Sequence, residues 1–551
     1  MTPSATIRRD LLAGLTVALV GLPQCLAYAM MSGVPPIYGI VTAAVPGLVA
    51  ALIGRSAQVV TGPTNTTGLL VLSALFPFLG ANGLIGPEGL PALATLALVA
   101  GVVRLIVAFG GGAALVRFLP ESVLVGFTAG AGVLIAAMQL DEALGLPPVN
   151  RARLLGEIEA LFAYFRAGVL PEIPSVVMMA CVVLSLFLGK RLVPRLPIAL
   201  VVLAALSLAA WFFGWNRDVG IPVVADREPV PSGWPERALP DLSLGMLQQF
   251  FVPSLAITLL GTLELAVTAR ARGARPDMKR EILAQGWANV AGAFTGSLPA
   301  SASLTRSALL AVSGARTRLA PAAAAVFVLP ILLVAAPAIA YIPQAALAGI
   351  LFVTAYRMIY GSAVARMWRA TPATRTLLVV TFSSALVMPL EWAILLGAGL
   401  GLVIHLARTS VPRIRLLEPV DLELTRLVPV KSGDGPETVV IEVSGDLHYA
   451  AVEPFLVELE HRLPPSARTV VMDLSHAHEM RFTALVAVER FASDLAEKGI
   501  RLLLAGVSED VLEMMEASAS ELEATPAEAE PYLSLRKCLR SIEEKRYQSS
   551  G

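Results

Sequence analysis

The chain has 551 residues, of which 56% are hydrophobic and 15% charged, and its formal net charge is zero. This composition is typical of a membrane protein, and the charge balance gives no support to a nucleic-acid partner. The cysteines, Cys25, Cys181 and Cys538, are too few and too far apart to predict a disulfide framework or a zinc site.

Apolar windows long enough to cross about 30 Å of hydrocarbon recur between residue 10 and about residue 407. We predict fourteen spans. The firmest windows are 36–53, 91–110, 122–140, 173–189, 196–214, 250–269, 318–336, 374–388 and 390–407, and the interrupted or short ones are 10–31, 64–79, 283–295, 302–313 and 343–356. The first window is interrupted at Pro23-Gln24 and lacks a signal-peptide cleavage site, so we expect it to remain as a span.

The basic residues of the short loops gather on one predicted side of the membrane, together with the N-terminus. They are Arg55, Arg117, Lys190, Arg191, Arg195, Arg270, Arg272, Arg275, Lys279, Arg280, Arg316, Arg318, Arg357, Arg366, Arg369 and Arg375. Such asymmetry marks the cytoplasmic side. An even number of spans then predicts that both termini are cytoplasmic, in a bacterial-type inner (plasma) membrane.

The pattern becomes that of a soluble domain near the C-terminus. We assign residues 1–408 to the membrane domain, 409–419 to a linker and 420–546 to the C-terminal domain. Strands are predicted at 422–430, 438–445, 468–475 and 500–506, with helices at 451–463 and 482–499. The alternation of strand and helix predicts a small α/β domain.

The membrane domain contains an internal repeat, with copies at about 10–214 and 250–408. VALVGLPQCLAYA aligns with ITLLGTLELAVTA, so that Gly21 matches Gly261 and Gln24 matches Glu264. A polar, proline-led segment follows each at a similar distance, beginning at Pro63 in one half and Pro299 in the other. Seven spans per half make the two copies inverted, and in inverted-repeat transporters the binding site lies between broken helices near the midplane.

Each proline-led segment predicts a half-helix that starts inside the membrane, near Thr64 and near Ser301, with the proline in the first turn and hydroxyl side chains as caps. The free amides and the positive end of each helix dipole suit an anion. Arg306 adds a full charge about a turn and a half into the second half-helix, where the insertion cost of arginine is about 2.5–3.5 kcal/mol. It either serves the anion or pairs with Glu264 or backbone carbonyls to hold the core together.

Glu264 lies deep inside a span. A buried carboxylate either carries a proton or binds a cation, and both couple an ion gradient to anion uptake. The alternative is a fixed salt-bridge partner. Thr268, one turn on, could supply a further oxygen to the ion. Gln24 and Tyr28 share one helix face and could donate hydrogen bonds to an oxyanion, or could join helices. All histidines lie at or beyond the last span, which argues against a histidine-based metal site or protease.

The two predicted half-helices occur together with the stretches GLPQCLAYA, GFTAGAGVLIAAMQL, TLELAVTAR, QGWANVAGAF and SLTRSALL. By these features the chain resembles the SulP family of anion transporters. The resemblance implies an all-α membrane domain of fourteen spans in a seven-plus-seven inverted repeat, divided into a core and a gate domain, a C-terminal α/β STAS domain, and a homodimer. It also implies substrate-binding positions, which are Gln24, Tyr28, Gly62, Pro63, Thr64, Ser303, Leu304, Thr305 and Arg306. Glu264 and Thr268 match ion-coupling positions, with proton or sodium left open.

The chain departs from the resemblance in its STAS region. Signalling STAS domains carry a serine-containing turn before the second helix, and here Phe482 stands at the position of that serine, with Thr483 as a weak candidate for modification.

The expected function is secondary active transport of a small anion of the sulfate, bicarbonate or dicarboxylate class, without a cofactor and without enzymatic activity. The alternatives are an uncoupled anion exchanger or channel that uses the same site, a nucleobase carrier of the same fold, and a STAS protein with a membrane anchor.

Overall fold

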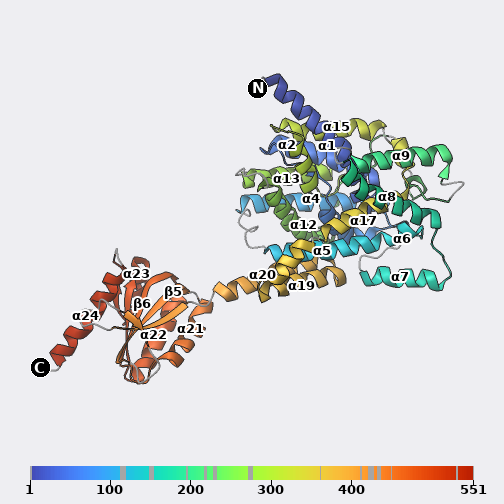
Figure 1. The fold of residues 1–551 in the computed structure, drawn as a ribbon. Coiled ribbons are helices and arrows are strands. Elements are labelled where there is room, and N and C mark those ends of the chain that lie inside the picture. Colours follow the sequence, from blue (N-terminus) through green and yellow to red (C-terminus); the bar gives the residue numbers. More distant parts are fainter. Residues whose placement is uncertain are drawn as a thin grey trace. The chain divides into compact units, whose positions relative to one another are not determined.

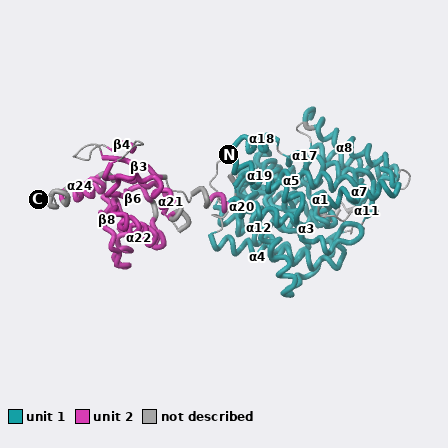
Figure 2. Tube along the Cα trace, turned by 90° about the horizontal axis from the view of Figure 1, so that it is seen from below, with its two compact units in different colours: residues 1–401 teal, residues 402–551 magenta. Residues whose placement is uncertain are grey.

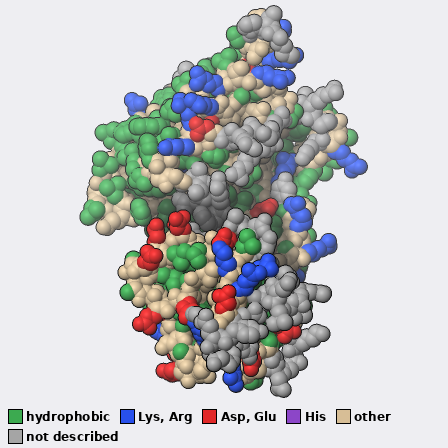
Figure 3. All heavy atoms as spheres, turned by 90° about the vertical axis from the view of Figure 1, so that its left-hand side faces the viewer, with side chains coloured by type: hydrophobic (Ala, Val, Ile, Leu, Met, Phe, Trp, Pro, Cys, Tyr) green, Lys and Arg blue, Asp and Glu red, His purple; other side chains and the backbone are tan. Residues whose placement is uncertain are grey.

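The computed structural model describes residues 3–111, 120–147, 154–193, 197–215, 220–227, 233–270, 277–334, 336–359, 361–409, 413–419, 427–430, 436–447, 449–528 and 531–549. The predicted loop residues Arg117, Arg195, Arg272 and Arg275 lie outside these ranges. The chain forms two compact units, residues 1–401 and 402–551 (Figure 2). On the face in Figure 3, hydrophobic side chains gather over the larger unit, whereas charged side chains are scattered over the smaller one.

Each of the predicted spans contains a helix (Figure 1). In the first half these are α1 (Pro3–Met31), α2 (Pro36–Ile53), α3 (Asn65–Leu75), α4 (Leu90–Phe109), α5 (Glu121–Met138), α8 (Ile173–Leu192) and α9 (Ile198–Phe213). In the second half they are α12 (Leu244–Arg270), α13 (Met278–Ala293), α14 (Leu304–Val312), α15 (Leu319–Val334), α17 (Gln344–Met358), α19 (Pro372–Val387) and α20 (Leu390–Thr409). The predicted interruption of the first span is wrong, because α1 continues through Pro23.

Among the described residues, six helices are long and apolar enough to cross a membrane, and six more are apolar but shorter. Helices α13 and α14 fall in neither group, because α13 is polar and α14 has only 9 residues. Short helices connect the spans: α6 (Leu140–Leu144), α7 (Leu154–Arg166), α11 (Val224–Arg227), α16 (Ala336–Ala340) and α18 (Gly361–Arg369).

The packing repeats between the two halves of the membrane unit. Helix α1 packs against α15, and its repeat mate α12 packs against α4; likewise α2 packs against α15 and α13 against α4. Helices α1–α4 and α12–α15 therefore form one packed group, the core domain. Helices α5–α9 and α16–α20 form the gate domain, in which α5 packs against α19 and α8 against α17. Helix α1 meets the gate domain at α9 and α17.

The smaller unit is built on a six-stranded mixed sheet in the order β4-β3-β5-β6-β7-β8. Its strands are β3 (Arg413–Pro419), β4 (Leu427–Pro429), β5 (Thr438–Leu447), β6 (Thr469–Met480), β7 (Arg501–Val507) and β8 (Glu523–Pro526). Strands β5 to β8 are parallel, and β3 pairs antiparallel with both β4 and β5. Buried side chains of β5, β6 and β7 pack against α21 (Tyr449–Arg462) and α22 (Phe482–Glu497) to form its core.

The boundaries of this unit differ from the predicted ones. Residues 413–419, assigned to a linker, form β3, because their alternating pattern continues the sheet beside β5. Helix α23 (Glu509–Ala517), strand β8 and helix α24 (Pro531–Ser549) were not predicted. Buried Leu535 and Leu539 of α24 cover the face of the sheet opposite α21 and α22. Helix α22 begins at Phe482, whose side chain is exposed.

Candidate functional site

Two very short strands cross at the centre of the core domain. Strand β1 (Thr61–Gly62) pairs antiparallel with β2 (Ser301–Ala302), so that Thr61 faces Ala302 and Gly62 faces Ser301. The Ser303 amide also donates to the carbonyl of Val60, at 2.9 Å. Each strand is followed within three residues by a helix, α3 after β1 and α14 after β2. The N-terminal ends of α3 and α14 therefore meet at one place, inside a buried region.

Hydroxyl side chains cap both half-helices. The Oγ1 atom of Thr64 accepts from the Thr67 amide at 3.3 Å, and the Oγ atom of Ser303 accepts from the Arg306 amide at 3.4 Å. The predicted proline in the first turn is wrong in both halves. Pro63 precedes the cap of α3, and Pro299 lies before β2, so the two prolines do not correspond structurally. The second half-helix starts three residues later than predicted, because Ser301 and Ala302 are in β2.

The start of α3 already holds a carboxylate of the protein itself. Glu264, from α12, is 8% exposed. One of its carboxylate oxygens accepts a hydrogen bond from the Thr66 hydroxyl, and the other accepts from the Thr64 hydroxyl at 3.3 Å. A negative group at this position is favoured by the free amides and the dipole of the helix. The α3 terminus is therefore shielded from a second anion.

The start of α14 is arranged in the same way but with a neutral partner. The Thr305 hydroxyl donates to Oε1 of Gln24 at 3.4 Å, as Thr66 does to Glu264 in the other half. Gln24 is the repeat mate of Glu264, so the contact is preserved while the charge is absent. Thr305 and its neighbour Leu304 are exposed, and Gln24 is half-buried. Of the two helix starts, that of α14 is the accessible and uncompensated one.

Arg306 lies in the first turn of α14, nearer to its start than predicted, and its side chain points into the core domain. Its Nη2 donates to the carbonyl of Pro63 at 2.8 Å, and its Nη1 lies 3.3 Å from Sγ of Cys25. Gly21 and Gly62 leave room for it: a Cβ atom at Gly62 would lie 2.7 Å from Nη1. The guanidinium thus ties α14 to the segment that precedes α3, and it brings a positive charge to the point where the two helix starts meet.

Arg104 has the corresponding place in the other half. It is 1% exposed, and a Cβ atom at Gly261, the repeat mate of Gly21, would lie 2.1 Å from its Nη2. Its guanidinium donates to the carbonyls of Ala300 at 3.0 Å and Ile257 at 3.2 Å. These contacts tie α4 to α12 and to the segment just before β2. Two arginines of different origin, one from α14 and one from α4, thus fill equivalent spaces beside equivalent glycines.

Sequence reasoning missed two polar residues of α13 that hold the strand crossing in place. Gln285 donates to Oγ1 of Thr61 at 2.5 Å. Asn289 both accepts from the Ala300 amide, at 2.6 Å, and donates to its carbonyl, at 3.1 Å. Both side chains are buried. Their spacing of four residues places them on one face of α13, and this spacing inside a predicted span was the signal that could have identified them.

Tyr28 and Thr268 lie at the edge of this arrangement. Tyr28 is buried, and its hydroxyl is within hydrogen-bonding reach of Thr354 of α17, in the gate domain. It is therefore positioned between the core and gate domains. The Thr268 hydroxyl donates to the backbone carbonyl of Glu264 at 2.7 Å, so the structure does not bring it to the carboxylate.

The groups around the crossing suit a small anion on one side and a small cation or proton on the other. The α14 start offers amides, the Thr305 hydroxyl and the Gln24 amide, which are donors for an oxyanion. The α3 start offers the Glu264 carboxylate and the hydroxyl oxygens of Thr64 and Thr66, which are oxygen ligands for a hard cation or a site for a proton. In the described parts of the chain, no cluster of three or more His, Cys, Asp or Glu residues could hold a metal ion.

Comparisons with known proteins identify the family and the fold of the chain. Residues 7–381 match the model of the Sulfate permease family, and residues 429–525 match the STAS domain. The chain is 28% identical over 531 residues to a probable sulfate transporter of Mycobacterium tuberculosis, covering 93% of this chain and 91% of the relative. It is 23% identical over 518 residues to a bicarbonate transporter of Picosynechococcus, covering 91% and 89%. The fold matches murine Solute Carrier 26 family member A9 with a TM-score of 0.84 at 17% identity, covering 98% of this chain and 92% of that one.

Proposed function

Because the chain belongs to the Sulfate permease family and is an anion transporter of that family rather than an enzyme, we propose that it is a secondary active transporter of a small oxyanion. The observation that carries the proposal is the asymmetry of the two half-helix starts. Thr66 of α3 holds the ionisable Glu264, whereas Thr305 of α14 holds Gln24, which cannot ionise. An anion is therefore accommodated at α14, and a counter-ion for Glu264 is accommodated at α3.

The anion binds to the first-turn amides of α14, with the Thr305 hydroxyl and the Gln24 side chain as further donors. Arg306 attracts the anion electrostatically without contacting it directly, because its guanidinium lies within the core domain next to Gly62. Ser303 shapes the start of the helix by capping the Arg306 amide, and Leu304 supplies an apolar wall. The segment before α3 takes part indirectly. Arg306 lies next to Gly62 and donates to the carbonyl of Pro63, and Thr64 caps α3. Sulfate, bicarbonate and a dicarboxylate all fit this set of donors.

Glu264 couples the anion to a proton or to sodium. Neutralising this carboxylate, by protonation or by a bound cation, removes a negative charge beside the anion, so the two ions favour each other's binding. Burying a charged carboxylate without a bound cation or proton costs free energy. The carrier therefore closes over the site more readily when Glu264 has bound its proton or cation. Thr268 contributes by fixing the helix backbone at Glu264 rather than as a direct ligand.

The uncoupled alternative rests on a specific observation. Glu264 already has two hydroxyl donors, and Arg104 is close enough to interact with it electrostatically, so the carboxylate could be a permanent part of the scaffold. Uptake of radiolabelled sulfate into proteoliposomes separates the two functions. Coupled transport predicts accumulation under an imposed proton or sodium gradient, whereas exchange without accumulation under either gradient would establish the uncoupled carrier.

The anion reaches both sides of the membrane by movement of the core domain against the gate domain. The contact of Tyr28 with Thr354 lies on the surface where the two domains meet. A disulfide between cysteines introduced at these positions should stop sulfate uptake and should release it again on reduction. Full uptake by a completely crosslinked sample would contradict the movement. The native cysteine Cys25 is buried in the core and needs replacement by serine for this test.

We further propose a homodimer, which the family resemblance implies, in a bacterial-type inner (plasma) membrane. Both termini lie in the cytoplasm, as the charges of the short loops predict. Protease cleavage of the C-terminal STAS domain in membrane vesicles of known orientation tests the side. Cleavage in inside-out vesicles alone is expected, and cleavage in right-side-out vesicles alone would reverse the orientation. The mass of the purified protein in detergent tests the dimer.

A further inference from the structure

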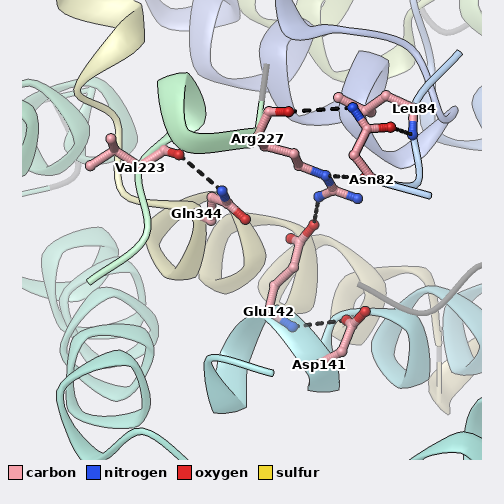
Figure 4. A network of polar contacts seen from close by, with 7 residues as sticks. All are labelled: Asn82, Leu84, Asp141, Glu142, Val223, Arg227 and Gln344. Carbon is pink, nitrogen blue, oxygen red and sulfur yellow. Dashed lines mark hydrogen bonds and ion pairs between the residues drawn. The ribbon is translucent and has the colours of Figure 1, made fainter. Parts of the chain in front are cut away.

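A partly buried ion pair lies at one end of the membrane unit, far along the chain from the strand crossing. Arg227, at the end of α11, pairs through Nη1 with the carboxylate of Glu142 in α6, and the two side chains are only 10% and 12% exposed. Arg227 also donates through Nε to the backbone carbonyl of Asn82, at 2.6 Å. Figure 4 shows the guanidinium between Asn82 and Glu142. Asn82 returns the contact, since its side-chain amide donates to the carbonyl of Arg227 at 3.3 Å.

The three residues belong to different moving parts. Asn82 lies in the connection between α3 and α4, in the core domain, where its side chain also accepts from the Leu84 amide. Glu142 lies in α6, directly after α5, in the gate domain. Arg227 is therefore a bridge between the core and gate domains.

The segment that carries Arg227 is anchored to the gate domain just before it. The Gln344 side chain, at the start of α17, donates to the carbonyl of Val223 at 2.9 Å. The Val224 amide donates to the carbonyl of Ile342 at 2.9 Å, and Val223 forms a bridge with Pro343. These contacts fix the backbone, and the side chain of Arg227 then reaches from this anchor to the core domain (Figure 4).

A polar cavity beside the ion pair lies along the same boundary. Leu72 and Met31 line it from the core domain, and Met138, Gln139 and Leu351 line it from the gate domain, together with Arg227 and Glu142. The Oε1 atom of Gln139 is buried and has no hydrogen-bond partner among the described residues. Water in the cavity would satisfy this acceptor, and separation of the two domains at this end would admit water.

We propose that Arg227 is the latch that holds this end of the carrier closed. The inference rests on the proposed movement of the core domain, and it adds the residues that control that movement. When the core domain moves away, Asn82 must release Arg227, because Arg227 and Glu142 both stay with the gate domain. Glu142 holds the guanidinium in the position from which it reaches Asn82. Loss of the pair should therefore raise the population of the state that is open at this end.

A cysteine at Leu72 reports that state without any need for transport. Leu72 is 7% exposed and lies on the core side of the cavity. The full-length protein carrying Leu72→Cys and Cys181→Ala, which removes the exposed native thiol, is placed in proteoliposomes. A membrane-impermeant maleimide is then added from either side. The same protein without Leu72→Cys measures the contribution of the buried native cysteines.

Glu142→Gln, which keeps the shape of the side chain, and Arg227→Ala should each raise the labelling rate about tenfold, because an open state populated at a few per cent becomes a major one. Arg227→Lys, which keeps the positive charge opposite Glu142 and a donor for the Asn82 carbonyl, should label more slowly than Arg227→Ala. Glu88→Gln, an exposed acid in the same α3–α4 connection, is the matched control and should leave the rate unchanged.

The outcomes distinguish the latch from the movement itself. Glu142→Gln that elutes and melts like the parent but labels at the parent's rate would overturn the latch, as would a folded Arg227→Lys protein that labels as fast as Arg227→Ala. A rate that responds to added sulfate but not to the ion pair would refute the latch and keep the movement. A rate that responds to neither would refute both.

Discussion

Replacing Glu264 by glutamine removes the charge from the start of α3 with little change in shape. The side chain accepts hydroxyl hydrogen bonds from Thr64 and Thr66. Glutamine keeps one acceptor oxygen, and its amide can donate to a hydroxyl that rotates. Hydrogen bonds to a charged group are worth about 1.5–3 kcal/mol and neutral ones about 0.5–1.5 kcal/mol. We therefore expect each of the two hydrogen bonds to become weaker by about 1–2 kcal/mol and the protein to keep its fold.

The effect on coupling should be much clearer than the effect on stability. A tenfold gradient of one monovalent ion stores about 1.4 kcal/mol, so coupling of one ion to one anion supports about tenfold accumulation. The Glu264→Gln variant has no site that changes charge, and we expect it to accumulate no radiolabelled sulfate under a proton or sodium gradient. It should still exchange external for internal sulfate, because the α14 site is intact.

Glu281→Gln is the matched control for this experiment. Glu281 is also a buried acid, but its carboxylate accepts from the amides of Arg55 and Ser56 at the far end of α2, at 2.8 Å each. This variant should retain gradient-driven accumulation. If Glu264→Gln accumulated sulfate as well as the parent protein does, the carboxylate would be a structural group and the coupling proposal would be refuted.

Three further predictions follow from the contacts of the crossing. Arg306→Ala should weaken sulfate binding by about tenfold or more. Arg104→Ala should chiefly lower the melting temperature, because it leaves two buried carbonyls without donors at a cost of about 1–3 kcal/mol each. Equal sulfate binding by both variants would make Arg306 a scaffold residue. Thr305→Val keeps the volume of the side chain but removes a hydrogen-bond donor. The affinity for sulfate, measured by equilibrium binding, should fall about 5–10-fold while the melting temperature of the protein stays unchanged. An unchanged affinity would show that Thr305 is not part of the anion site. Gly261→Ala puts a methyl group into the space of Arg104 and should destabilise the protein by about 1–3 kcal/mol in thermal unfolding; unaltered stability would show that Arg104 can move aside.

The sequence repeat predicted several equivalent contacts of the core domain, because residues that match in the two copies pack in the same way. Gly21 and Gly261 match in the alignment, and in the structure each borders a buried arginine. The contacts of Gln24 with Thr305 and of Glu264 with Thr66 are likewise equivalent. What the alignment could not give is the register of the polar segments. Proline is compatible with several positions before a helix, so Pro63 and Pro299 matched in spacing without matching in structure.

Other features depend on partners distant in sequence. Nothing near Arg227 in the chain identifies Asn82 or Glu142 as its neighbours, because the three come from different connections between spans. Strand β3 comes soon after the last membrane helix, and its place in the sheet depends on pairing with β5, which the sequence of β3 alone does not reveal. The direction of Arg306 was open for the same reason, since helical spacing gives the face of a short helix but not which neighbour leaves room for a long side chain.

The position of the bound anion is the most direct measurement of how this carrier works. A cryo-electron microscopy map of the full-length protein should be compared with and without saturating sulfate, or with the anion that competes best against it. We expect new density at the start of α14, between Thr305, Gln24 and the first-turn amides. Saturating sulfate that left this place empty and occupied another would contradict the pairing of half-helices as the anion site.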